Sequence, residues 1–249
     1  MRWAERRIQG LLAAALLAAA MVARADEAQI QRALEARIPG LKVESVQATP
    51  MHGLYEVVYQ GPDGPQIVYV DEAADFLLSG SLHDLKAKRN LTKERLSKLS
   101  AIDFDKLPLD LAVKVQRGDG RRVLAIFSDP YCPYCRHLEK ELLQIGDITV
   151  YVFMYPVIRP ANADHSRAVW CSKDRAKAWL DLAARDQPKV PAAAATCANP
   201  IDQILALGRK LHVNSTPTLY FANGERATGG MQVADLRAKL DEVAKQAAK

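Results

Sequence analysis

The sequence lacks an apolar stretch long enough to span a bilayer, and it has only four cysteines and no internal repeat. A membrane-spanning helix needs about 20 apolar residues, whereas the unbroken apolar run Leu11–Val22 has twelve. Of the 249 residues, 49% are hydrophobic and 25% are charged. This composition is typical of a globular protein and excludes wholesale disorder.

The short apolar run has the flanks of a secretory signal peptide. Arg2, Arg6 and Arg7 precede it, and an Ala-Arg-Ala cleavage site ending at Ala25 follows it. No cysteine follows the run directly, which argues against a lipid anchor. We therefore predict export, with residues 1–25 removed after Ala25.

The chain that remains after removal of the signal peptide has little net charge. The formal charge of +5 falls to +2 once residues 1–25, which carry four Arg and one Glu, are removed. Such a balanced chain has no electrostatic attraction to nucleic acid, so no nucleic-acid partner is expected.

The spacing of apolar and turn residues over 26–88 predicts a small α+β domain. We expect a helix over 27–38 and strands over 42–47, 54–59, 66–70 and 76–79. A unit this small is marginal alone and gains stability from pairing with another copy. Residues 89–105 are rich in charge and predict an exposed linker helix, with Thr92 as its N-cap.

Residues 106–249 alternate strands and helices, which predicts an α/β domain with a mixed sheet. The expected strands are 123–127, 148–155 and 218–221, and the expected helices are 132–143, 164–185, 201–211 and 233–245.

Cys132-Pro133-Tyr134-Cys135 lies between a predicted buried strand and a predicted helix. Cys-x-x-Cys in this context indicates dithiol redox chemistry. Free N–H groups and the dipole at a helix N-terminus favour a thiolate there. We expect Cys132 to be the nucleophile and Cys135, one turn inside, to resolve the mixed disulfide. Tyr134 is expected to flank the sulfurs.

Zinc binding and an inert structural disulfide are the alternatives for this motif. Structural zinc usually takes two such pairs, and Cys171 and Cys197 do not form a second one. Four cysteines allow three disulfide pairings. The Cys-x-x-Cys motif leaves Cys171 and Cys197 for each other in an exported chain, with two buried free thiols as the alternative. No metal and no organic cofactor is expected beyond the redox-active Cys132–Cys135 disulfide.

The segments FSDPYCPYC, VWCSKDRAKAW and STPTLYFANG resemble the periplasmic thiol:disulfide interchange proteins of the DsbC/DsbG family. The resemblance implies a thioredoxin-like α/β domain with a helical insertion, preceded by a small N-terminal α+β dimerisation domain and a linker helix. It places the redox pair on Cys132 and Cys135, and the cis-proline loop on Thr216 and Pro217. The DsbC branch has a structural disulfide that falls on Cys171 and Cys197.

The resemblance implies a periplasmic homodimer that acts as a disulfide isomerase and as a chaperone. Exported proteins with wrong disulfides would be its clients, and a membrane thiol reductant would supply electrons. A net dithiol oxidant or glutaredoxin-like reductase, and a mainly chaperone-type binding protein, are the alternatives. In contrast to thioredoxin, the predicted strand 123–127 holds no acidic residue, and Glu139 is a candidate proton acceptor for Cys135.

Overall fold

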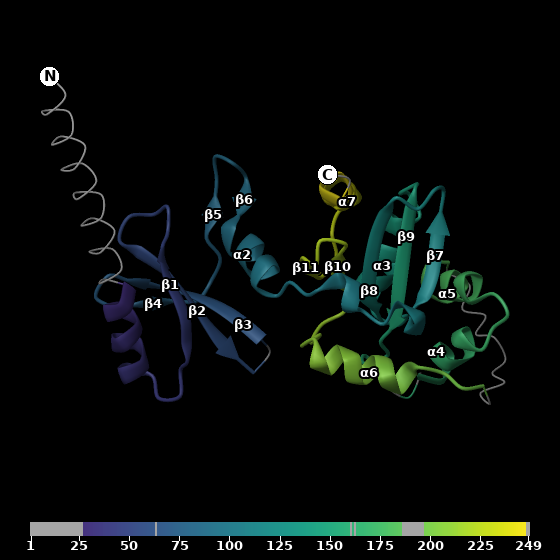
Figure 1. Cartoon of the computed structure of the whole chain (residues 1–249), viewed down its shortest axis with the longest axis horizontal. Coiled ribbons are helices and arrows are strands. Elements are labelled where there is room, and N and C mark those ends of the chain that lie inside the picture. The colour runs from purple at the N-terminus through teal and green to yellow at the C-terminus, as the bar shows by residue number, and fades with distance from the viewer. Residues whose placement is uncertain (1–26, 63, 160, 162, 186–196, 248–249) are drawn as a thin grey trace, which may run out of the picture. The chain divides into compact units, whose positions relative to one another are not determined.

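The computed structural model describes residues 27–62, 64–159, 161, 163–185 and 197–247 (Figure 1). The expected signal peptide and its cleavage site at Ala25 lie outside these residues. The chain divides into two units, the first ending at Leu96 and the second beginning at Ser97. This division falls within the segment 89–105 that the sequence predicts to be a linker. Within the described ranges, no helix is both long and apolar enough to cross a membrane.

The N-terminal unit is an antiparallel sheet packed against a helix over residues 27–37 (Figure 1). The strands, in spatial order, are β1 (Val43–Ala48), β2 (Leu54–Gly61), β3 (Gly64–Asp71) and β4 (Leu77–Leu78). The helix contributes Ile30 and Leu34, one turn apart, to the buried core. The sheet contributes apolar side chains from β1, β2 and β3 to this core, and Val68 and Val70 of β3 alternate along the strand. Ile67 and Tyr69, beside and between them, are also buried, so β3 is covered on both faces.

Strand β4 forms the last strand of this sheet and is shorter than the predicted 76–79. Phe76, Leu77 and Leu78 are 77%, 48% and 57% exposed, although all three are large and apolar. We refer to these three residues as the β4 edge. A strand edge with exposed apolar side chains is a site where a second chain can pair.

A two-stranded ribbon follows, made of β5 (His83–Asp84) and β6 (Arg89–Asn90), and leads into α2 (Leu91–Leu99). The prediction that Thr92 caps this helix is wrong. Asn90 Oδ1 accepts a hydrogen bond from the backbone N–H of Lys93 at 2.8 Å, which is the capping interaction. Thr92 is instead buried, and its hydroxyl accepts from the N–H of Leu82 at 2.8 Å.

The C-terminal unit is built on a five-stranded mixed sheet in the order β11-β10-β8-β9-β7. Only β8 and β9 are parallel; the other neighbours are antiparallel. The strands are β7 (Val113–Arg117), β8 (Arg122–Ser128), β9 (Ile148–Met154), β10 (Thr218–Phe221) and β11 (Arg226–Thr228). Two short 3-10 turns, Phe104–Lys106 and Leu109–Leu111, precede β7.

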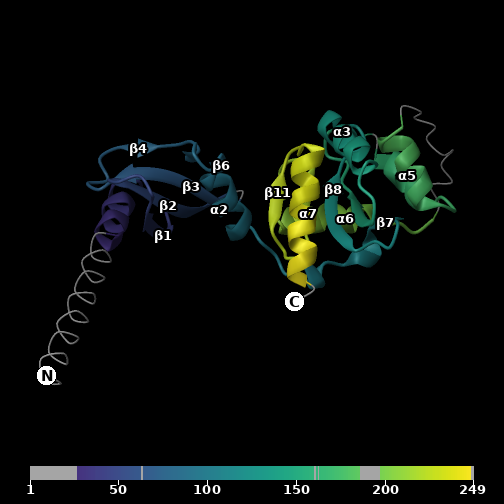
Figure 2. The ribbon, with the colours of Figure 1, turned by 90° about the horizontal axis from the view of Figure 1, so that it is seen from above.

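Helices pack against this sheet, with α7 on β8, α5 on β7 and α6 on β9 (Figure 2). The helices are α3 (Pro133–Leu142), α4 (Ala163–Trp170), α5 (Arg175–Ala183), α6 (Ile201–Lys210) and α7 (Val233–Ala247). The alternation of strands and helices predicted from the sequence is confirmed.

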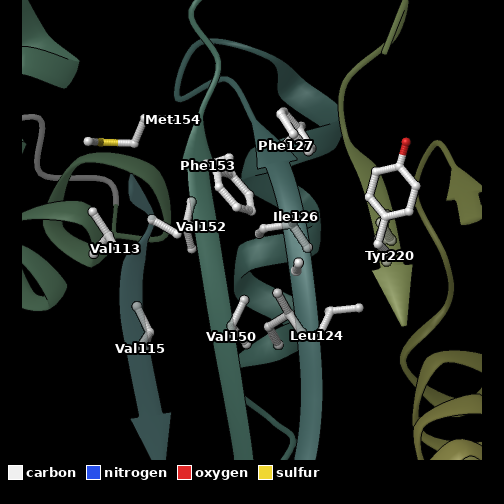
Figure 3. Close-up of a cluster of buried hydrophobic side chains, with 14 of the residues drawn as sticks. Val113, Val115, Leu124, Ile126, Phe127, Val150, Val152, Phe153, Met154 and Tyr220 are labelled. Carbon is white, nitrogen blue, oxygen red and sulfur yellow. The ribbon is translucent and has the colours of Figure 1, made fainter. Parts of the chain in front are cut away.

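The core of this unit lies on the central strands (Figure 3). Strand β8 is buried from Leu124 to Ser128, as expected for a strand covered on both faces. The rings of Phe127 and Phe153 stack with centroids 4.8 Å apart, and Tyr220 meets Phe127 edge-on. This packing fixes the carboxyl end of β8, where the cysteine motif begins.

The prediction of one long helix over 164–185 is wrong, because the segment forms two helices, α4 and α5. Asp174 interrupts it: its side chain accepts a hydrogen bond from the N–H of Lys177 at 2.9 Å and caps α5. Apolar periodicity continues through the break, so the capping residue is the only local signal of it.

Candidate active site

The connection between β8 and α3 carries the cysteine motif. Cys132 is the N-cap of α3, and Pro133 occupies the first helical position, where its missing N–H leaves no donor unsatisfied. The carbonyl of Cys132 accepts the N–H of Arg136 at 3.0 Å, the first bond of the helix. Cys135 therefore lies inside the first turn and is fully buried, whereas Cys132 is 4% exposed.

Asp129 holds the turn that presents Cys132. Its carbonyl accepts the N–H of Cys132 at 3.1 Å. Its buried carboxylate accepts the N–H of Tyr131 at 2.8 Å and that of Ile158 at 2.7 Å. One side chain thus fixes both the turn before α3 and the segment after β9.

The loop before β10 lies against the cysteine motif. The Thr216–Pro217 peptide bond is cis. The Cys132 thiol donates to the carbonyl of Thr216 at 3.3 Å across 84 positions of sequence. The structure thus brings together Cys132, Cys135, Thr216 and Pro217, which the sequence named as site residues.

An apolar rim adjoins the cysteines. Tyr134 is 68% exposed on the first turn of α3. Val157 and Ile158 are also exposed, and the bond from Ile158 to Asp129 ties them to the cysteine turn. Tyr131 is more buried, and its hydroxyl hydrogen-bonds Nδ1 of His165 on α4. We refer to Tyr134, Val157 and Ile158 as the apolar rim.

The two cysteines have different surroundings. Burial raises the pKa of the Cys135 thiol to about 12. The N–H of Asp129, 3.4 Å from the Cys135 sulfur, partly opposes this rise, and the charge on Cys132 adds to it. Cys135 is consequently a poor nucleophile at neutral pH unless a base accepts its proton.

Comparison with known proteins supports the same chemistry. The profile of the disulfide bond isomerase protein N-terminal domain matches residues 21–93, and that of a thioredoxin-like domain matches residues 109–244. The probable thiol:disulfide interchange protein DsbC of Bordetella pertussis is 43% identical over 204 residues, covering 82% of this chain and 70% of its own. The chain belongs to the DsbC family of thiol:disulfide interchange proteins.

Other members of this family extend the match over nearly the whole chain. DsbC of Escherichia coli is 27% identical over 243 residues, covering 94% of this chain and 96% of its own. A crystal structure of a disulfide interchange protein from Neisseria gonorrhoeae, 37% identical, aligns with a TM-score of 0.53 over 55% of this chain and 99% of that one. These matches confirm the fold class, the resemblance and the disulfide-exchange activity inferred from the sequence.

The second cysteine pair lies outside the connection between β8 and α3. Cys171, at the end of α4, forms a disulfide with Cys197, which precedes α6, and their Cα atoms are 5.9 Å apart. The bond closes a chain segment that includes the break between α4 and α5. Cross-linking a loop of this length stabilises a fold by roughly 3–4 kcal/mol in the chain-entropy description.

We therefore expect thiol titration in mild reductant to find two free thiols per chain, from Cys132 and Cys135. Replacing both Cys171 and Cys197 with Ala should lower the free energy of unfolding by about 3 kcal/mol. Urea unfolding of this variant beside the parent chain measures the loss. Four free thiols at low reductant would contradict a stable second disulfide.

Sequence reasoning missed two residues of this site, Ser128 and Asp129. Both follow the predicted strand directly, but their partners lie far along the chain or on the next helix. Glu139 was identified only as a candidate. Its position four residues after Cys135 was the available signal, since residues i and i+4 share a helix face.

Proposed function

We propose that this chain is a periplasmic disulfide isomerase that uses Cys132 as nucleophile and Cys135 as resolving thiol. The observation that supports it is the placement of the two sulfurs. Cys132 is the N-cap of α3 and contacts the loop before β10, whereas Cys135 is fully buried inside the first turn of α3. Only the first sulfur is placed for attack on an external disulfide.

The exchange proceeds in two balanced steps. The Cys132 thiolate attacks one sulfur of a client disulfide, forms a mixed disulfide and releases the other client sulfur as a thiolate. A client thiolate then displaces Cys132 and leaves the client with a rearranged disulfide. Alternatively, Cys135 displaces the client, which removes two electrons from the cysteine pair. A membrane thiol reductant returns these electrons and keeps the pair reduced.

The apolar rim and the cis-proline loop bind the client. Tyr134 offers a large, half-apolar surface next to Cys132, and the loop at Thr216 lies against Cys132, beside the sulfur that a client peptide must reach. Exposed apolar side chains beside a thiol suit misfolded exported proteins, which expose apolar segments of their own. The same surface supports chaperone activity.

Two copies of the chain pair through the N-terminal unit. Strand β4 is the last strand of its sheet, and the three apolar side chains of the β4 edge are exposed. A second copy can therefore extend the sheet at this strand. A twofold axis is the commonest arrangement for such pairing. The homodimer then carries two Cys132 sites for one client.

Alkylation tests the assignment of roles. In reduced protein at pH 7, iodoacetamide should modify Cys132 much faster than Cys135, because the Cys135 thiol is buried with its pKa near 12. Peptide mapping after timed quenching gives the two rates separately. Equal rates, or faster labelling of Cys135, would overturn the assignment.

A further inference from the structure

Resolution of the mixed disulfide requires Cys135 to lose a proton inside the protein. The thiol is fully buried, and its environment disfavours the thiolate. No acidic residue lies on β8, the strand that leads into the motif. The proton must therefore pass to a group that the buried sulfur can reach without solvent.

A continuous set of polar groups leads away from this sulfur. The Ser128 hydroxyl, at the end of β8, lies close enough to the Cys135 sulfur to lower the pKa of its thiol, and the next residue, Asp129, donates its N–H to that sulfur at 3.4 Å. The same hydroxyl lies 3.4 Å from Oε1 of Glu139. Glu139 is on α3, one turn after Cys135, and only 3% exposed. Among the residues that the structure describes, Glu139 forms no ion pair, and a buried carboxylate without one costs stability when it is charged.

We propose that Glu139 accepts the Cys135 proton through the Ser128 hydroxyl when Cys135 attacks the mixed disulfide at Cys132. This step rests on the proposed function. The Cys135 S–H gives its proton to Ser128 Oγ, and the Ser128 O–H gives its own to the Glu139 carboxylate. The Cys135 sulfur bonds to the Cys132 sulfur as the client thiolate leaves, and the Glu139 carboxyl ends neutral.

The groups around Glu139 suit this role. Burial raises the pKa of its carboxyl to about 7, while Trp179 of α5, Ser128 and the positive charge of Arg117 on β7 oppose the rise. The Trp179 indole nitrogen is buried and finds no hydrogen-bond partner of good geometry among the described residues, so the carboxyl of Glu139 is the nearby acceptor that it favours in the charged form. A base that titrates near the working pH exchanges protons most efficiently.

Asp129 is the other buried acid near Cys135. Its two carboxylate oxygens accept backbone N–H bonds from Tyr131 and Ile158. These bonds fix the turn and occupy both carboxylate oxygens. Asp129 is therefore a positioning residue. In the described chain, no backbone N–H donates to the Glu139 carboxyl, so its oxygens are open to accept a proton.

A two-phase reaction with 5,5'-dithiobis(2-nitrobenzoate) separates the two steps. Attack by Cys132 releases the first thionitrobenzoate and leaves a mixed disulfide, and attack by Cys135 releases the second. Stopped-flow absorbance of the reduced full chain gives both rates from pH 6 to pH 10. The first phase tests the proposed function, and the second phase alone tests the relay.

Glu139→Gln should slow the second phase on the order of 10²-fold at pH 7 and leave the first phase unchanged. The difference should shrink as pH rises, because hydroxide then removes the Cys135 proton directly. Ser128→Ala should give the same loss, and the double variant should lose no more than either single one, since both break one path. Glu141→Gln, which removes an acid from the same helix, is the matched control and should leave both phases unchanged.

A second phase of parent rate in Glu139→Gln or in Ser128→Ala would overturn the relay. So would a loss of equal size at every pH, which indicates a structural role only. Absence of the first phase in the parent chain would instead contradict the role of Cys132 as nucleophile. Failure of the proposed function, seen in the first phase, is therefore distinguishable from failure of the relay, seen in the second phase.

Discussion

Replacing Cys132 with Ser should reduce disulfide rearrangement to the rate of the thiol buffer alone, because no other sulfur is placed for attack. Cys135 is fully buried behind the first turn of α3, and Cys171 and Cys197 are bonded to each other. A Ser hydroxyl at position 132 retains the N-cap preference but forms no disulfide. The loss is therefore chemical and not a loss of fold.

Cys135→Ser should behave differently. Attack by Cys132 remains, but the internal thiol that releases stalled clients is absent. This variant should accumulate mixed disulfides that migrate as high-mass species on non-reducing gels and disappear with reductant. Cys132→Ser should form none of them.

Scrambled ribonuclease, assayed with and without a reductant, measures both variants. Recovery of ribonuclease activity in reductant reports isomerisation, because the reductant keeps Cys132 as a thiol. Without reductant the oxidised Cys132–Cys135 pair has no thiolate to attack the client, so this assay gives the background. The double replacement of Cys171 and Cys197 by Ala is the matched control, since it removes two sulfurs that are not part of the Cys132–Cys135 motif. It should keep the exchange activity at temperatures where it remains folded. Activity near the parent level in Cys132→Ser would remove the basis of the proposed mechanism.

The sequence was sufficient to predict the redox motif, because its signal is local. A strand, a short turn and two cysteines at helix spacing fall within residues 123–135, and each element has its own pattern. The antiparallel N-terminal sheet was also predictable, since the turn around Gly61 and Gly64 separates two alternating runs.

The supporting residues of the site were not predictable, because their partners are distant. Asp129 meets Ile158, 29 positions away, and only the folded sheet brings β8 and β9 together. The break between α4 and α5 has a different cause. Its apolar faces continue across Asp174, and a single capping residue decides the boundary.

Thr92 illustrates the limit of capping rules. Asn90 and Thr92 both have the side chains of an N-cap. The N-terminal unit buries Thr92 against Tyr69, and this tertiary contact leaves the cap to Asn90. Burial of a hydroxyl with partners therefore outweighed local preference at this helix start.

A fragment that begins at Ser97 should be monomeric and should lose most isomerase and chaperone activity while it keeps simple dithiol exchange. The second unit has its own core and contains both redox cysteines. Reduction of insulin needs one accessible Cys132, whereas rearrangement needs a client held through several exchanges. A dimer provides that longer contact.

Point variants in the full mature chain separate dimerisation from the rest of the N-terminal unit. Leu77→Asp places a charge on the β4 edge, and it should halve the mass measured by light scattering at micromolar concentration. Insulin reduction should persist and isomerase activity should fall to that of the fragment. Met51→Asp, at another exposed apolar position of the same unit, is the control and should remain dimeric. A parent chain with the mass of one copy, which is at most 27.4 kDa, would mean that the N-terminal unit binds clients as part of a monomer.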